Sequence, residues 1–473
     1  MNIDSSNVSE RDNHLPDKND WQYLLSEFQS ISHDFLNKLE SKSVATLSPE
    51  LAASGLSEKG EGMTELLNTL KSALLPQMSA SRGPRYWGFV TGGSTPVATF
   101  ADWMVSLLDQ NVAKGGDSIA TQIERQAIEW LVELFDLPSS FTGLFTTGAT
   151  ASNFLAAVTA RQFAGQQQDI DVAKVGMRAL DVEVFSACPH ASMIKTLGLA
   201  GFGQHNIVWV NTEANSEKMD TRDLAHRLET SSAKSKIVIS SAATVTGTSF
   251  DDLQHIAEVC QEHKAWLHVD AAFGIFERLL SYETSDGDHV SAGLELADSI
   301  TLDGHKWLNV PYDSGIFLTR HQELLVQSCH VAAPYLVNCG NGPDYMSLGI
   351  ENSRRFRAFP TWMTLFSYGK EGVAWWVKKN LEQAQQLASY IDKSVGYQLV
   401  YPCDLNVVLF KPAGKTDCAE VLRQINQTGR LFLSPGKWDG EDIIRAAICN
   451  WQTEQTDIDI AINVLEEVAA TLS

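Results

Sequence analysis

The sequence predicts an α/β protein, in which helices cover both faces of a mostly parallel sheet and a smaller C-terminal α+β domain follows. Between residues 84 and 320, short apolar runs alternate with helical patterns, as they do in strand–helix–strand units. From about residue 360 onward, the pattern changes to one long helix, short strands and a final helix. We expect a tail and helical arm over 1–80, a large domain over 81–358 and a small domain over 359–473.

The N-terminal arm is predicted from helical periodicity. Residues 1–20 are polar and acidic, and they lack the apolar core of a signal peptide. Apolar side chains recur at helical spacing from Trp21 to about Ser41, and a second short helix over 64–75 ends at Pro76. An amphipathic helix outside the main body must cover its apolar face, so we expect it to dock on a partner subunit or on its own chain.

The large domain is predicted from strand–turn–helix units that repeat along the chain. Strands connected through helices pair in parallel, and ligands of such sheets bind beyond the carboxyl ends of the strands. In the small domain, a helix is expected over Gly372–Tyr390 and a strand over Asn406–Lys411. The seven strands expected in the large sheet are 144–147, 182–185, 207–210, 237–240, 265–269, 300–302 and 315–318.

The composition argues against several classes of protein. Against 58 Asp and Glu there are 36 Lys and Arg, and the net charge of −22 does not suit a nucleic-acid-binding protein. No stretch approaches the roughly 20 apolar residues that a membrane span needs. The seven cysteines form no CxxC pair, so neither a metal site nor a disulfide framework is indicated. We expect a cytoplasmic protein that binds neither nucleic acid nor membrane.

The segment TTGATASN, residues 146–153, is a candidate anion site between a strand and a helix. Glycine and small side chains let the backbone approach a phosphate, and the N-terminus of the following helix offers free N–H donors. Ser152 and Asn153 could add side-chain donors. The same residues also suit a simple helix cap, and the spacing is neither a Walker loop nor GxGxxG.

Three reactive side chains follow other predicted strands. AWLHVDAAFG ends a strand in Asp270, whose carboxylate is costly to bury unless it meets a cation or a metal, although it could also cap the next turn. Lys306, in DGHKWL, is flanked by apolar side chains that favour the neutral amine used in Schiff-base chemistry, although most lysines are solvated surface charges. His190, in ACPHASMIK, also lies just past a strand.

Together these groups suit one cofactor. Pyridoxal phosphate needs an amine for its aldehyde, a carboxylate for its pyridine nitrogen and an anion site for its phosphate. The sequence supplies these in the order anion site, His190, Asp270 and Lys306, each at the end of a predicted strand. We therefore expect a pyridoxal 5′-phosphate enzyme that holds no metal.

The combination of HVDAAFG with DGHKWLNVPYDSG resembles the group II pyridoxal-phosphate decarboxylases, which include aromatic-L-amino-acid, histidine and glutamate decarboxylases. The similarity runs from about Arg82 to Arg357. It implies the type I fold of pyridoxal-phosphate transferases, a homodimer, and decarboxylation of an L-amino acid to its amine and carbon dioxide. An aminotransferase, a decarboxylating aldehyde synthase and a non-catalytic member of the fold remain the alternatives.

The resemblance also implies residue roles. Lys306 bonds the cofactor, Asp270 partners the pyridine nitrogen and His190 stacks on the ring. Thr244 matches less cleanly, because Ala243 stands where the family usually has glycine. The segment RYWGFVTGGSTP, residues 85–96, copies neither the aromatic nor the glutamate enzymes, so the substrate stays open. The remaining implied cofactor contacts are Ala151, Ser152, Ala272 and His305.

Tyr345 is the last candidate. The segment Tyr335–Asn352 is rich in glycine and lacks strong periodicity, so we expect a mobile loop that closes over the site. Tyr345 lies nine residues before Arg354, the offset at which aromatic-amino-acid decarboxylases carry a loop tyrosine. The resemblance implies that Tyr345 protonates Cα after carbon dioxide leaves, from the neighbouring subunit. It also implies that tyrosine here, rather than phenylalanine, favours amine over aldehyde.

Overall fold

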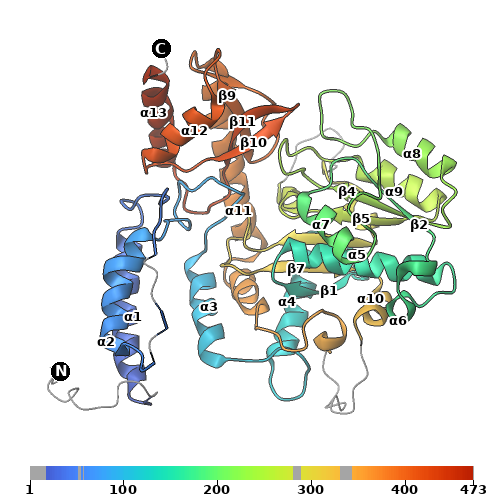
Figure 1. Ribbon diagram of the computed structural model, residues 1–473, viewed down its shortest axis with the longest axis horizontal. Helices are drawn as coiled ribbons and strands as arrows, with labels where there is room; N and C mark the ends of the chain where they lie inside the picture. Colours follow the sequence, from blue (N-terminus) through green and yellow to red (C-terminus); the bar gives the residue numbers. More distant parts are fainter. Residues whose placement is uncertain (1–16, 52–54, 57, 281–288, 331–343, 472–473) are drawn as a thin grey trace.

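The large domain is built on a seven-stranded sheet. The computed structural model describes residues 17–51, 55–56, 58–280, 289–330 and 344–471 (Figure 1). The order of the strands in the large sheet is β1-β7-β6-β5-β4-β2-β3, and all except β7 run in the same direction, so the predicted α/β class is confirmed. The strands are β1 (Thr142–Thr146), β2 (Val182–Ser186), β3 (Ile207–Trp209), β4 (Ser235–Ser241), β5 (Trp266–Asp270), β6 (Ser299–Asp303) and β7 (Gly315–Thr319).

Strand β7 runs antiparallel to both of its neighbours, β1 and β6. Its first residue, Gly315, therefore lies opposite Thr146 and Asp303, the last residues of β1 and β6. A Cβ atom at Gly315 would lie 2.3 Å from the Cα of Gly148, so only glycine lets the turn after β1 come this close. The reversal thus brings three strand ends to one place.

Helices pack against the sheet and bury its strands. Helix α5 packs against α7 and α10 and runs across β6 and β7, while α4 packs against β1 and α9 against β5. Most residues of β4 to β7 are buried, as expected for strands covered on both faces. The helices are α3 (Pro96–Leu108), α4 (Ala120–Leu134), α5 (Ala149–Gln166), α6 (Val172–Val175), α7 (Ala191–Leu199), α8 (Thr221–Thr230), α9 (Leu253–Glu262) and α10 (Gln322–Cys329).

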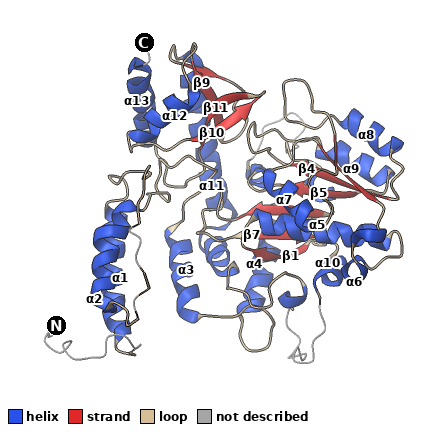
Figure 2. Cartoon of the chain, viewed as in Figure 1, coloured by secondary structure: helices blue, strands red, loops and turns tan. Residues whose placement is uncertain are grey.

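The C-terminal part forms a second, antiparallel sheet with its own apolar core, seen as a separate group of strands in Figure 2. Helix α11 (Ala358–Lys393) contacts α3 and α4 as well as β8 and β9, so it belongs to both parts. The small domain is therefore found as predicted, whereas its boundary at residue 359 stays a prediction. Its other elements are β8 (Tyr397–Leu399), β9 (Val407–Pro412), α12 (Cys418–Gln427), β10 (Ser434–Trp438), β11 (Glu441–Ala447) and α13 (Gln455–Thr471).

The N-terminal arm lies at the edge of the molecule, outside the large sheet (Figure 1). Helix α1 (Asp20–Asn37) buries none of its residues, and Trp21 is 63% exposed. Lys71, just after α2 (Gly62–Thr69), forms an ion pair with Glu27 at 2.5 Å. The ring of Phe28 meets Trp103 of α3 edge-on, at a centroid distance of 4.9 Å. This subunit therefore covers only part of the apolar face of α1.

Candidate active site

The predicted reactive residues meet at the carboxyl ends of the parallel strands. Asp270 is the last residue of β5, His190 precedes α7 just after β2, and Lys306 lies in the turn between β6 and β7. The Lys306 side chain is 19% exposed, with its Nζ 3.3 Å from Oδ2 of Asp303 and 5.6 Å from the centre of the Phe273 ring. The amine thus lies between a carboxylate and an aromatic face.

Asp270 is a buried carboxylate whose partners are neutral. Its Oδ2 accepts a hydrogen bond from Nδ2 of Asn153 at 2.9 Å, and its Oδ1 accepts one from the N–H of Ala272 at 3.2 Å. Among the described residues, no Lys, Arg or His forms an ion pair with it. A carboxylate this buried is costly without a positive partner, and a protonated pyridine nitrogen would supply one. The residues present therefore fit pyridoxal phosphate.

His268 orients the Asn153 side chain that contacts Asp270, a role that the sequence analysis missed. Its Nε2 lies 3.2 Å from Oδ1 of Asn153, and its Nδ1 lies 2.9 Å from the hydroxyl of Ser299. Burial lowers the pKa of His268 to about 4, so the ring is neutral, with its proton on Nε2 for Asn153 to accept. Asn153 therefore orients Asp270 from within helix α5. The side-chain amide that could have served a phosphate donates instead to Asp270 and Ser192.

His190 is fixed by the same group of side chains. It caps α7, accepting a hydrogen bond from the N–H of Ser192, and its Nδ1 lies 2.7 Å from the Ser192 hydroxyl. That hydroxyl also accepts from Asn153 at 3.1 Å. Burial lowers the pKa of His190, and the nearby carboxylate of Asp270 opposes this effect. A neutral imidazole is thereby held beside Asp270.

The predicted anion site lies at the N-terminus of α5, but its predicted side chains do not all point to one place. Gly148 adopts a φ of 148°, and the N–H of Ala149 donates to Oδ1 of Asp303 at 2.7 Å. Ser152 is fully buried, and its hydroxyl lies 2.8 Å from that of Thr146, so it faces the sheet. Ala151, in the first turn of α5, is partly exposed. The N–H groups of Ala151 and Ser152 both donate to the carbonyl of Gly148, so phosphate binding at this turn stays a prediction.

His305 and Thr244 have their polar atoms engaged within this subunit. Nδ1 of His305 accepts from the N–H of Ser314 at 3.3 Å, and its ring packs on Tyr312 at 4.4 Å between centroids. Thr244 donates to Glu217 at 2.5 Å. Ala243, just before it, has a φ of 68°, a conformation that costs about 1 kcal/mol outside glycine and explains why glycine is usual there. Cofactor contacts by Thr244 and His305 stay predictions.

Arg445 is a further candidate that the sequence reasoning missed. It projects from β11 of the small domain, is nearly buried, and donates to the carbonyl of Val245 in the large domain. Its Nε is buried without a hydrogen-bond partner among the described residues. Burial lowers its pKa, and its charge acts on His190. No carboxylate among the described residues hydrogen-bonds this guanidinium, although the charge of Glu217 acts on it, so Arg445 is a candidate positive group from the small domain.

Tyr345 belongs to the predicted loop over 335–352, of which residues 335–343 lie outside the described part, so the closing loop stays a prediction. Tyr345 itself begins a short turn of helix and is 3% exposed. Its ring packs on the guanidinium of Arg354 at 4.8 Å, and Arg354 forms a buried ion pair with Glu124 at 2.7 Å. Burial raises the pKa of Tyr345. Proton donation by Tyr345 stays a prediction.

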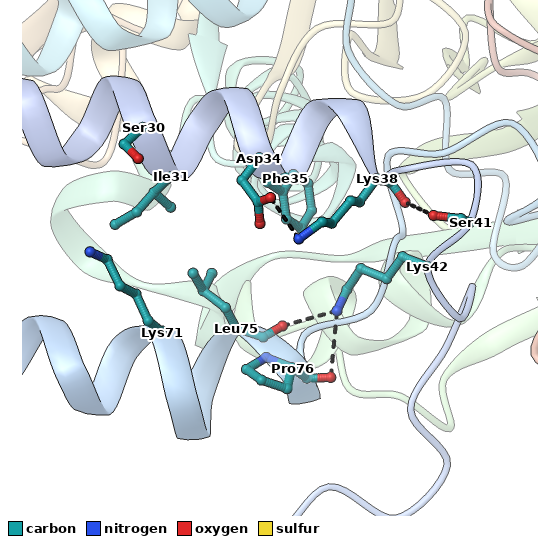
Figure 3. A pocket seen from close by; sticks show the side chains of 10 residues that line it. All are labelled: Ser30, Ile31, Asp34, Phe35, Lys38, Ser41, Lys42, Lys71, Leu75 and Pro76. Carbon is teal, nitrogen blue, oxygen red and sulfur yellow. Dashed lines mark hydrogen bonds and ion pairs between the residues drawn. The ribbon is translucent and has the colours of Figure 1, made fainter.

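A cavity lies in the N-terminal arm, away from the strand ends (Figure 3). This cavity of about 620 Å³ lies between α1 and the segment from Lys71 to Pro76. Its lysines already have partners, since Lys38 pairs with Asp34 and Lys42 donates to the carbonyls of Leu75 and Pro76. Within the described ranges, no cluster of His, Cys, Asp or Glu could hold a metal ion, and no helix is long and apolar enough to cross a membrane.

Comparisons with known proteins point to one family. Residues 47–412 match the pyridoxal-dependent decarboxylase conserved domain. The aromatic-L-amino-acid decarboxylase of Bacillus atrophaeus is 28% identical over 462 residues, which cover 92% of this chain and 93% of that protein. The 4-hydroxyphenylacetaldehyde synthase of Rhodiola rosea is 23% identical over 431 residues, covering 87% of this chain and 86% of that protein. Oryza sativa TDC, solved with PLP and tryptamine, has a TM-score of 0.86 at 21% identity and covers 96% of this chain and 99% of its own.

The fold and the buried carboxylate of Asp270 suit an enzyme that uses pyridoxal phosphate. Because the conserved domain spans well over half of the sequence, the chain belongs to the pyridoxal-dependent decarboxylase family. Its cofactor is pyridoxal 5′-phosphate, and its reaction is the decarboxylation of an amino acid. The family, the cofactor and the reaction class expected from the sequence are confirmed.

Proposed function

We propose that the protein decarboxylates an aromatic L-amino acid and releases the amine and carbon dioxide. The observation that carries the cofactor chemistry is the buried carboxylate of Asp270, which shares a sheet edge with the amine of Lys306. The aromatic substrate class is supported by the aromatic-L-amino-acid decarboxylase that this chain resembles over 92% of its length. The aromatic ring of Phe273 near the amine, and that of Tyr312 packed on His305, suit such a side chain.

The described residues divide the task of holding the cofactor. Lys306 would bond it, Asp270 would pair with its ring nitrogen, and His190 and Ala272 would contact the two faces of the ring. The backbone at the start of α5 would receive its phosphate. When bound, pyridoxal phosphate supplies an electron sink for the pair of electrons left at Cα. Trp307 and Leu308 are fully buried beside Lys306 and limit the access of water.

Arg445 would bind the carboxylate of the substrate. Among the described residues no carboxylate hydrogen-bonds its guanidinium, and its charge acts on His190. Charge-assisted pairs between arginine and carboxylate are stronger than neutral hydrogen bonds and fix orientation. The small domain would thus orient the substrate while the large domain holds the cofactor.

Arg445→Met should raise KM for the amino acid by about 10- to 100-fold, the loss expected for one charge-assisted hydrogen bond. Cofactor content should stay at the parental value, since Arg445 is not proposed to hold the cofactor. Arg430→Met is the matched control, because it removes an equal charge from an exposed pair with Glu467 in the same domain. Steady-state kinetics of both variants and of the parent provide the test. If Arg445→Met has the KM of the parent, Arg445 does not take part in substrate binding.

Carbon dioxide release across a panel of amino acids tests the function itself. We expect release from tryptophan, tyrosine or 3,4-dihydroxyphenylalanine, with an equal amount of amine. Release from glutamate alone would overturn the aromatic class, and release from none would overturn decarboxylation. Aldehyde synthesis is the second candidate, because an aldehyde synthase is among the similar proteins. Equal amounts of aldehyde and ammonia, with consumption of oxygen, would identify that reaction instead.

We also propose a homodimer in the cytoplasm. The exposed apolar face of α1, with Trp21 and Leu25 more than half exposed, supports a second subunit as its cover. The six described cysteines are all free, which suits a reducing compartment. Light scattering at working concentration should give twice the 52.0 kDa of one chain. A fully active monomer would contradict the homodimer.

A further inference from the structure

Asp303 contacts several groups at the start of α5 and beside Lys306. It is the last residue of β6 and is 3% exposed. Its Oδ1 accepts the hydrogen bond from the N–H of Ala149, at the start of α5, at 2.7 Å. Its Oδ2 lies 3.3 Å from Nζ of Lys306 and 3.6 Å from Nε2 of His305. One carboxylate thus links a helix N-terminus, the reactive amine and a histidine.

The groups that contact Asp303 are also groups that would attract a phosphate. A helix N-terminus attracts anions through its free N–H groups and its dipole, and Asp303 already accepts from one of those groups. Burial lowers the pKa of His305, which disfavours its charged form, and Nζ of Lys306 is the nearer of the two nitrogens to Oδ2 of Asp303. A dianionic phosphate near α5 would therefore lie close to a second, buried negative charge. Two like charges this close in a protein interior repel each other strongly.

We propose that Asp303 is a positioning residue that serves as the resident counter-anion of this end of the site. It keeps the Lys306 ammonium and the start of α5 paired before the cofactor arrives, and it then opposes the incoming phosphate. Asp303 thereby sets the affinity for pyridoxal phosphate below the value that a neutral side chain would allow. The inference concerns capture of the cofactor and does not depend on which amino acid is the substrate.

Asp303→Asn is the direct test, because the amide keeps an oxygen for the N–H of Ala149 and removes the charge. Equilibrium dialysis of the full-length protein against pyridoxal phosphate should give a dissociation constant about 10-fold lower than that of the parent. The affinity for pyridoxal, which lacks the phosphate, should increase clearly less. Asp303→Glu, which keeps the charge, should show no gain for either compound.

Asp298→Asn is the matched control, since Asp298 directly precedes β6 and pairs with His321 at 2.7 Å, at the opposite end of the same strand. It should bind both compounds with parental affinity. Parental or weaker binding of pyridoxal phosphate by Asp303→Asn, or an equal gain for pyridoxal, would overturn the proposal. If Asp303→Asn does not melt cooperatively, Asp303→Ser replaces it with the same expected result.

Discussion

Lys306→Ala should abolish turnover, with a fall of at least about 1,000-fold, while the protein still folds. The Lys306 side chain is partly exposed and makes one ion pair, so its loss removes a nucleophile rather than core packing. Asp303 would lose its charged partner, and a modest decrease in melting temperature should accompany the loss of activity. Activity within a few-fold of the parent would refute the assignment of Lys306.

Borohydride reduction, together with thermal melting, shows whether Lys306→Ala has lost only the reactive amine or also the fold. In the parent, peptide mapping should find a pyridoxyl group on the peptide that carries Lys306. In Lys306→Ala this adduct should be missing, although a cooperative melting transition remains. Lys411→Ala is the control, because it removes a lysine that pairs with Glu441 in the small domain. It should keep both the activity and the adduct.

Asp270→Asn should retain part of the cofactor but lose most activity, by about 100-fold or more, since one charge–charge contact of several kcal/mol is removed. The amide can keep the hydrogen bond with Asn153, so the site should hold its shape. A neutral amide cannot keep a pyridine nitrogen protonated, however, and the ring then accepts electrons poorly. Bound cofactor, measured by its visible absorbance, and turnover should therefore separate in this variant. Parental rates would remove Asp270 from the mechanism.

Local sequence patterns predicted most of the fold. The alternation of apolar runs with helical patterns placed all seven strands of the large sheet to within a few residues. Helix α11 consists of two helical segments that meet at Gly369, whose φ of 60° is not helical. The helix predicted from Gly372 corresponds to the second segment, and the first segment, from Ala358, was missed. The antiparallel direction of β7 was also missed. A short strand carries no local signal for the direction of its neighbour.

Site residues that lie next to a predicted strand were found from the sequence. Contacts between residues that are far apart in the sequence were missed. Asp270 and Lys306 each follow a strand, so topology alone brought them to one edge. The contact of Asn153 with Asp270 spans 117 positions, and that of Arg445 with Val245 spans 200. No spacing rule reports such pairs. The role of His268 could have been suspected from HVDAA, since a histidine inside a fully buried strand must find partners.

Proton linkage through His268 gives the folded protein a built-in sensitivity to acid. Its folded pKa of about 4 lies below the ordinary 6.5, so the unfolded chain binds more protons between these two values. The stability contributed by the neutral ring is complete above about pH 6.5 and is lost as the pH falls toward 4, by at most about 1.4 kcal/mol per pH unit. Protonated His268 would carry a charge into the sheet behind Asp270. Acid therefore acts on the cofactor site from its interior side as well as from solvent.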